Sequence, residues 1–450
     1  MSQVIALLPN VELLALAMAC LSLILALGRA IGSRLQLRLW GVPEALVAGL
    51  LGLLLAPAGP LPLLPAAVMQ LWADLPLVLL TLVFGSLLLG KPLPQLGGLW
   101  RPVSAQVSLA LVLAFGQYVV GGLAVLLVLQ PWLGVSPVMA CLIEVAYEGG
   151  HGSAAAMGPS YAALGFPGGQ ALGLAMATVG LLSSTLVGGL VVVLARSRGW
   201  LRADGPGSDA GDPADTTSGV SGGAAAWAVN LALVGVAVLI GAGLLAGLRW
   251  LTAGLGDGFA DVVKTLPVFP LAIVGSLLVR LALERSGRAH WATPAVQGQV
   301  GTLSADLLIT AATAGLDLGL LRADWLPLTV LAVGGLVWNL GVTLLLAPRL
   351  LPADWFERAV IEFGQATGVA ASGLLLLRMA DPADQSDALP AFSLKQLLLQ
   401  PFLAGGVITV VAPLAVAGWG LPLWTGVCFA LVLLFGGTGL WLARAQAPAP

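Results

Sequence analysis

The sequence predicts an all-α protein that crosses a membrane many times. Only 9% of its 450 residues are charged and 59% are hydrophobic, whereas about 25% of the residues of a soluble protein are charged. Uncharged stretches of about 20 residues, the length of helix that crosses a bilayer, recur along the chain. The net charge of −2 and the lack of any basic run argue against a nucleic-acid partner. Membrane lipid is the expected surrounding.

Polar breaks divide most of the chain into eleven apolar stretches that we expect to span the membrane: 3–28, 41–58, 73–90, 104–130, 168–195, 224–252, 263–283, 296–320, 325–347, 393–416 and 421–443. Two further stretches, about 135–165 and 354–379, are each interrupted by a small, polar, Gly-rich tip. Each tip leaves arms of about 12 residues, which reach about 18 Å and cannot cross. We expect two re-entrant hairpins whose backbone groups are satisfied inside the protein.

The order of these elements predicts an internal repeat. Residues 199–223 are rich in Gly, Asp, Ser and Pro, which predicts a flexible linker. The linker separates a first repeat, 1–198, from a second, 224–416, and an additional helix follows at 421–443. Each repeat holds five spans and one hairpin, and because five is odd the two copies are expected to be inverted in the membrane.

The hairpin tips show the repeat in the sequence itself. Residues 148–156 align without a gap on 362–370, at an offset of 214, with identical Glu, Gly and Ala at three positions and similar residues at four more. Each copy occupies the same place in the order of elements. The alignment therefore predicts two equivalent tips.

Lys and Arg are distributed unevenly between the two sides that this order defines. Sixteen fall on one side, and three, Arg249, Lys264 and Arg322, fall on the other. Because cytoplasmic loops carry the excess of Lys and Arg, the linker and the C-terminus are expected inside the cell and the N-terminus outside.

The tips have the composition of a small-molecule site. Glycines let a backbone approach a ligand closely, the start of the second arm presents free N–H groups to an anion, and the end of the first arm presents carbonyls to a cation such as Na⁺. Because the two hairpins enter from opposite faces, their tips are expected to meet near the midplane. The predicted substrate-binding residues are Gly149, Gly150, His151, Gly152, Ser153, Gly364, Gln365, Thr367 and Gly368.

Three acids are predicted to bind the coupling ion, because an ionisable group at membrane depth is costly enough to suggest a function. These are Glu148, Glu362 and Asp306, and the ion is expected to be Na⁺ or H⁺, with no organic cofactor. The alternative for Glu148 and Glu362 is a local cap or ion pair. Glu144 lies on the helical face of Glu148, but it could instead face a water-filled cavity.

Other polar residues have simpler interpretations. Ser153, Gln365 and Thr367 could cap helices instead of binding substrate. Gln117 and Asn339 occupy the fourth helix of each half, where polar side chains often join helices across a bundle.

Several of these features together resemble the bacterial sodium:glutamate symporter family. They are Gly149-Gly150-His151-Gly152-Ser153 in a hairpin, Val42-Pro43-Glu44 at the start of the second helix, and the glycines that follow Trp355. The resemblance covers most of residues 1–416. It implies inverted five-helix repeats, a homodimer in the bacterial inner membrane and an elevator-type movement. The chain departs from the family pattern at Glu148, where the family has Ser, and at Glu362, where it has His.

The expected function is sodium-coupled symport of glutamate or a related amino acid or carboxylate. The alternatives are a proton-coupled transporter of another small solute and, less favoured, a channel. An enzyme is not expected, because the only histidines, His151 and His290, build no convincing catalytic triad or metal pair.

Overall fold

The computed structural model describes residues 11–37, 43–90, 100–201, 223–253, 263, 266–316, 318–351, 354–382 and 385–446. Throughout these ranges the regular structure is helical, which confirms the predicted all-α class. Val42, Lys264 and residues 202–222 of the predicted linker lie outside the described residues.

Across the described ranges, eight helices are long and apolar enough to cross a membrane. Their number and composition support an integral membrane protein. Seven fall on predicted spans and the eighth, α18, falls on the second predicted hairpin. The eight are α2 (Val11–Arg34), α4 (Ala66–Leu87), α5 (Trp100–Ala124) continued by α6 (Gln130–Leu133), α10 (Gly169–Ser197), α11 (Ala224–Thr252), α16 (Trp325–Gly341) continued by α17 (Ala347–Leu350), α18 (Trp355–Ala380) and α21 (Leu421–Gln446).

Four predicted spans take another form, so the count of eleven is not confirmed. Helix α3 (Glu44–Leu55) has 12 residues, because the chain turns extended at Ala56, before a proline. Helix α13 (Phe269–Arg285) has 17 residues, and α14 (Pro294–Ala314) is long enough but too polar to be one of the eight.

The prediction of one continuous span at 393–416 was wrong. The segment consists of α19 (Ala388–Leu399) and α20 (Val407–Trp419), separated by a break in which Ala404 and Gly405 have φ of +53° and +92°. These backbone conformations cannot continue an α-helix.

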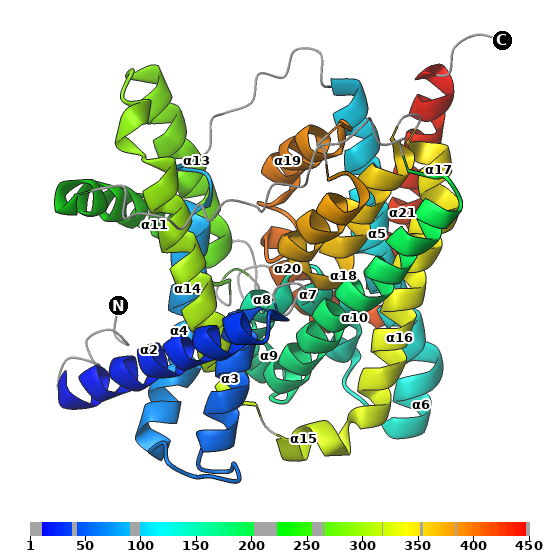
Figure 1. Ribbon diagram of the computed structural model, residues 1–450. Helices are drawn as coiled ribbons and strands as arrows, with labels where there is room; N and C mark the ends of the chain where they lie inside the picture. The colour runs from blue at the N-terminus through cyan, green and yellow to red at the C-terminus, as the bar shows by residue number, and fades with distance from the viewer. Residues whose placement is uncertain are drawn as a thin grey trace.

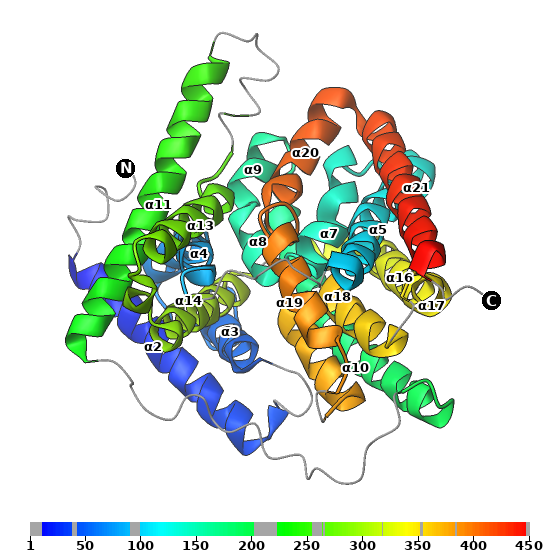
Figure 2. The ribbon, with the colours of Figure 1, turned by 90° about the horizontal axis from the view of Figure 1, so that it is seen from above.

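The helices form two bundles that lie side by side (Figures 1 and 2). The first bundle consists of α2, α3, α4, α11, α13 and α14, and the second contains α5, the first hairpin, α10 and α16 to α21. Small residues bring neighbouring helices close together, as is usual in membranes. A Cβ on Gly28 of α2 would lie 2.5 Å from Cβ of Ala48 in α3, and one on Gly275 of α13 would lie 2.0 Å from the carbonyl oxygen of Ala237 in α11.

Each bundle takes helices from both halves of the chain, so the bundles cut across the predicted repeats. The bundles meet at α8 (Gly150–Ala156), which packs against α4 and α14. There, Gly152 lies between Leu80 and Leu308, at 3.0 and 3.7 Å from where its Cβ would be. This boundary was not visible in the sequence.

The two halves follow the same order of elements up to the hairpin. In the fourth long helix of each half a π-helical segment, η2 (Val125–Leu129) or η5 (Val342–Leu346), is followed two residues later by Pro131 or Pro348. The corresponding positions are 217 residues apart. This correspondence supports an internal repeat at an offset slightly larger than the predicted 214.

Candidate functional site

The segment predicted to form the first hairpin, called the first hairpin below, contains η3 (Pro137–Cys141), α7 (Leu142–Tyr147), α8 and α9 (Gly158–Ala163). Its helix is interrupted at Glu148-Gly149, and Gly150 has φ of +67°, a conformation that glycine adopts at little cost. The predicted Gly-Gly tip is therefore the place where the first arm ends.

The second hairpin lies within α18. The backbone leaves the helix at Gly368 and at Val369, where φ is 68° and ψ is 166°. A Cβ on Gly364 would lie 2.4 Å from Cα of Gly373, although residues nine apart in a straight helix are about 13 Å apart. The chain therefore reverses at 368–369, and neither arm has the length of a full span.

The two tips touch. A Cβ on Gly150 would lie 2.4 Å from Cγ1 of Val369, so only glycine fits at the first tip without a shift. Helix α10 supports the contact, because a Cβ on its Gly180 would lie 2.4 Å from the carbonyl oxygen of Thr367 and 2.5 Å from the ring of Tyr147. Segments that are more than 200 residues apart in the chain thus meet at one place.

The structural correspondence between the hairpins differs from the gap-free alignment. Glu144 precedes the turn at Gly150 by six residues, and Glu362 precedes the turn at Gly368 by the same number. The structural counterpart of Glu362 is therefore Glu144. Glu148 lies at its tip, whereas Glu362 lies within an arm, six residues before the turn.

Glu144 is fully buried and joins three elements. Its Oε2 accepts a hydrogen bond of 2.5 Å from the Tyr118 hydroxyl of α5, and its Oε1 accepts one of 2.8 Å from Thr409 of α20 and a longer one, 3.4 Å, from the N–H of Ala404. A buried carboxylate is tolerated when it is bonded in this way. Glu144 holds the first hairpin against the break between α19 and α20.

Glu148 and Ser153 are buried with bonding capacity to spare. Glu148 Oε2 and Ser153 Oγ have no hydrogen-bond partner among the described residues, and such orphaned groups are expensive unless a ligand or water meets them. A Cβ on Gly405 would lie 2.4 Å from Ser153 Oγ, so the helix break approaches this group closely. His151 Nε2 lies 2.9 Å from the Thr178 hydroxyl of α10.

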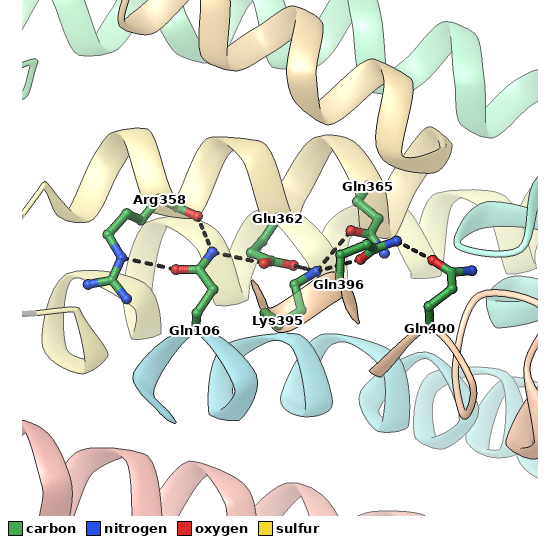
Figure 3. Close-up of polar contacts among 7 residues, drawn as sticks. All are labelled: Gln106, Arg358, Glu362, Gln365, Lys395, Gln396 and Gln400. Carbon is green, nitrogen blue, oxygen red and sulfur yellow. Dashed lines mark hydrogen bonds and ion pairs between the residues drawn. The ribbon is translucent and has the colours of Figure 1, made fainter. Parts of the chain in front are cut away.

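Glu362 is paired with a buried lysine (Figure 3). Its Oε2 lies 2.8 Å from Nζ of Lys395 in α19, and both side chains are almost fully buried. Its Oε1 accepts a 2.8 Å hydrogen bond from the side chain of Gln106. From the sequence alone, every Lys and Arg is expected at a loop or at the end of a span. That was wrong for Lys395 and for Arg358, which is buried and bonds Gln106 at 3.0 Å.

A row of polar side chains continues from Lys395 through Gln396 to Gln400 (Figure 3). Lys395 Nζ donates to Gln396, Gln396 donates to Gln400, and Gln400 donates to the carbonyl oxygen of Ala404, whose own N–H meets Glu144. Glu362 and Glu144 are therefore connected through α19 and the helix break.

Polar side chains of three long helices hold the second tip. Asn339 of α16 donates to the carbonyl oxygen of Ala366 and to Thr367 Oγ1, at 2.9 and 3.1 Å. Gln117 of α5 donates to the same carbonyl at 2.7 Å, and Ser184 of α10 donates to the carbonyl oxygen of Gly364 at 3.1 Å. Gln117 and Asn339 thus join helices, as the simpler interpretation has it, but the segment that they join is the tip.

The family model for the sodium/glutamate symporter matches residues 11–365, most of the chain. The chain belongs to the sodium/glutamate symporter family. Comparison with curated proteins and with solved structures yields no match. Membership in the symporter family implies a Na⁺-coupled transporter of a small molecule. The family is one of transporters rather than of enzymes. The match ends at residue 365, so Lys395 and the helices from α19 onward lie beyond it.

For this symporter, the structure brings most of the predicted site residues together but sets one apart. Asp306 of α14 forms an ion pair of 2.6 Å with Arg29 of α2. Both residues belong to the first bundle, and both side chains are partly exposed. Its role as an ion ligand stays a prediction. The glycines Gly149, Gly152, Gly364 and Gly368 all lie at close approaches of backbone or side chains.

Several neighbours of the hairpin acids come from outside the hairpins and were not predicted from the sequence. Tyr118, Thr409 and Ser184 are single hydroxyls in apolar helices and gave no pattern. Lys395 is the third residue of the predicted span 393–416, so it resembled a charge at a span end.

Proposed function

We propose that this protein carries glutamate or a closely related amino acid or carboxylate into the cell together with Na⁺, and that both bind where the two hairpin tips meet. The observation that carries the proposal is the contact of Gly150 with Val369, beside buried oxygens of Glu148 and Ser153 that have no partner in the part of the chain that the structure describes. Family membership supplies the Na⁺-coupled class, and the fit of a cation to the site is supported by carboxylate and hydroxyl oxygens, which hard cations prefer.

The substrate would bind to the backbone and polar side chains of the tips. His151, Ser153 and Thr367 are the polar side chains, and the glycines named above give access to the backbone. The side-chain oxygen of Gln365 accepts a 2.9 Å hydrogen bond from Lys395. To contact the substrate directly, Gln365 would have to share this oxygen between Lys395 and the substrate.

Charge balance favours a cation that enters with the substrate. Glutamate brings two carboxylates toward buried Glu144 and Glu148, and like charges about 4 Å apart repel by about 4 kcal/mol at an effective dielectric of about 20. A Na⁺ ion beside Glu148 would offset this repulsion. A proton on Glu148 would do so as well, which keeps the proton-coupled alternative open to test.

The test is uptake of labelled glutamate, other amino acids and dicarboxylates by the purified protein in liposomes. Accumulation driven by an inward Na⁺ gradient supports the proposal. Accumulation driven by a proton gradient alone supports the proton-coupled alternative, and flux that never exceeds equilibrium supports a channel.

Changing Glu148 to Gln should abolish or shift the dependence of uptake on the Na⁺ gradient, because the amide keeps the shape of the side chain but removes its charge. The measurement is initial uptake rate against Na⁺ concentration. Glu12→Gln is the matched control, since Glu12 is an exposed acid in the first turn of α2. Unchanged Na⁺ dependence in Glu148→Gln would make Glu148 a structural cap.

The architecture supports an elevator. We propose that the first bundle is the scaffold of a homodimer in the bacterial inner membrane and that the second bundle, which carries both hairpins, moves across it. The repeated order of elements supports inverted repeats with a cytoplasmic linker. Three of the basic residues counted on the cytoplasmic side are buried in the structure: Arg280, Arg358 and Lys395. Without them, the excess of Lys and Arg on that side remains.

Cysteines introduced at Gly211 and at Asp257, both outside the described residues, should react from opposite sides of the membrane in a variant without native cysteines. An odd number of spans between the two positions would put them on opposite sides. Labelling of intact cells with an impermeant maleimide, before and after permeabilisation, measures this. Labelling of both from one side would refute the inverted repeat.

A further inference from the structure

The Lys395 ammonium lies in a shell of oxygen atoms (Figure 3). Its Nζ is 2.8 Å from Glu362 Oε2, 2.9 Å from Gln365 Oε1 and 3.2 Å from Gln396 Oε1. On another side it lies 4.3 Å from the centre of the Phe392 ring. One carboxylate and two amide oxygens around a single positive charge are the kind of ligands that a small hard cation takes in a protein.

Both carboxylate oxygens of Glu362 have a partner in this arrangement. Lys395 occupies Oε2 and Gln106 occupies Oε1. Glu148 differs, because its Oε2 has no partner among the described residues. The two hairpins therefore differ in what their acids can accept: one offers an open carboxylate oxygen, and the other already holds a cation.

We propose that the Lys395 ammonium is a tethered cation that takes the place of a Na⁺ ion at the second hairpin. This inference rests on the proposed Na⁺-coupled function and adds to it the division of labour between the hairpins. An ammonium is a compact point charge with three donors, which matches three oxygen acceptors.

A tethered cation has a consequence for coupling. Lys395 is part of α19, so it is never released. It therefore neutralises Glu362 both when the site faces the outside of the cell and when it faces the inside. Of Glu148 and Glu362, Glu148 then remains to bind a cation that exchanges with solution and follows its gradient.

The alternative is an ion pair that serves only to hold α18 to α19. The two interpretations differ in what happens when the lysine is removed. A buried carboxylate that has lost its partner is strongly unfavourable. If the oxygens around Nζ form a cation site, Na⁺ should enter it, whereas a purely structural pair would leave a destabilised protein that Na⁺ does not rescue.

The experiment compares wild type, Lys395→Met and Glu362→Gln/Lys395→Met. Thermal unfolding of the purified, substrate-free protein is followed as NaCl replaces KCl at constant ionic strength. In Lys395→Met, the dependence of stability on the logarithm of Na⁺ concentration should increase by about one bound ion relative to wild type. The double variant has no carboxylate to neutralise, so it should keep the wild-type dependence.

Several results would overturn the inference. They are a wild-type Na⁺ dependence in Lys395→Met, a rescue of Lys395→Met by acid but not by Na⁺, and an equal gain in the double variant. If Lys395→Met aggregates in KCl, it should stay monodisperse when it is extracted in NaCl, and aggregation in both salts also refutes the tethered cation.

The outcome is separate from that of the proposed function. No substrate is present in the unfolding experiment, so an added Na⁺ site in Lys395→Met stands whether or not glutamate is the transported molecule. Failure of glutamate uptake in liposomes would instead overturn the substrate and leave the unfolding result unaffected.

Discussion

Replacing Gly373 with alanine should force the arms of the second hairpin apart and reduce uptake to background. The added Cβ would lie 2.3 Å from the carbonyl oxygen of Ile361 and 3.2 Å from the N–H nitrogen of Gln365. These are backbone atoms, which cannot rotate away as the end of a side chain can. Overpacking of this kind destabilises a protein by about 1–3 kcal/mol, and here it also displaces the tip.

The matched control is Gly243→Ala in α11. An added Cβ there would meet no heavy atom within 4 Å among the described residues outside its own helical turn, so the variant should be neutral or gain about 0.5–1 kcal/mol. Thermal unfolding followed by size-exclusion chromatography and uptake in liposomes measure both variants. Equal behaviour of Gly373→Ala and Gly243→Ala would contradict the reversal at 368–369.

Joining the two bundles covalently should stop transport while substrate still binds. Ala155 of α8 and Ala312 of α14 belong to one apolar cluster at the boundary between the bundles. Cysteines at both positions, in a variant without Cys20, Cys141 and Cys428, can be bridged by Hg²⁺. If the second bundle must slide past the first, the bridge should remove uptake completely.

Two controls separate the bridge from its side effects. Each single-cysteine variant should transport with or without Hg²⁺, and an excess of a small thiol should restore uptake in the double variant. Binding of labelled substrate to the bridged protein in detergent should remain measurable. Full uptake by a protein shown to be bridged would exclude an elevator movement at this boundary.

Much of the fold could be predicted because its causes are local. The span 224–252 coincides with α11, since a long uncharged stretch between polar segments has few alternatives in a membrane. The first hairpin was predicted from Glu148-Gly149-Gly150 for a similar reason: adjacent glycines in an apolar stretch mark a place where the helix can end.

The rest depends on contacts between segments that are far apart in the chain. Lys395 resembles a charge at a helix end until α18 places Glu362 beside it, and a single sequence carries no record of that pairing. The sequence alignment of the hairpins has an offset of 214 because it pairs Glu148 with Glu362, which are chemically alike. The structure pairs Glu144 with Glu362 instead, because each lies six residues before its turn. The residue types alone do not show where each glutamate lies relative to its turn.

The mixed origin of the bundles has a consequence for how the protein is made. Helix α3 packs against α14, and α5 packs against α21, so the early helices enter the membrane long before their partners are synthesised. A helix satisfies its backbone hydrogen bonds alone in lipid and can wait there singly. The short, broken hairpin segments cannot, since their turns are satisfied by other helices. Assembly of the tips should therefore be among the last steps, after α16 to α20 have been delivered, and it is during this interval that the chain is most exposed to misassembly.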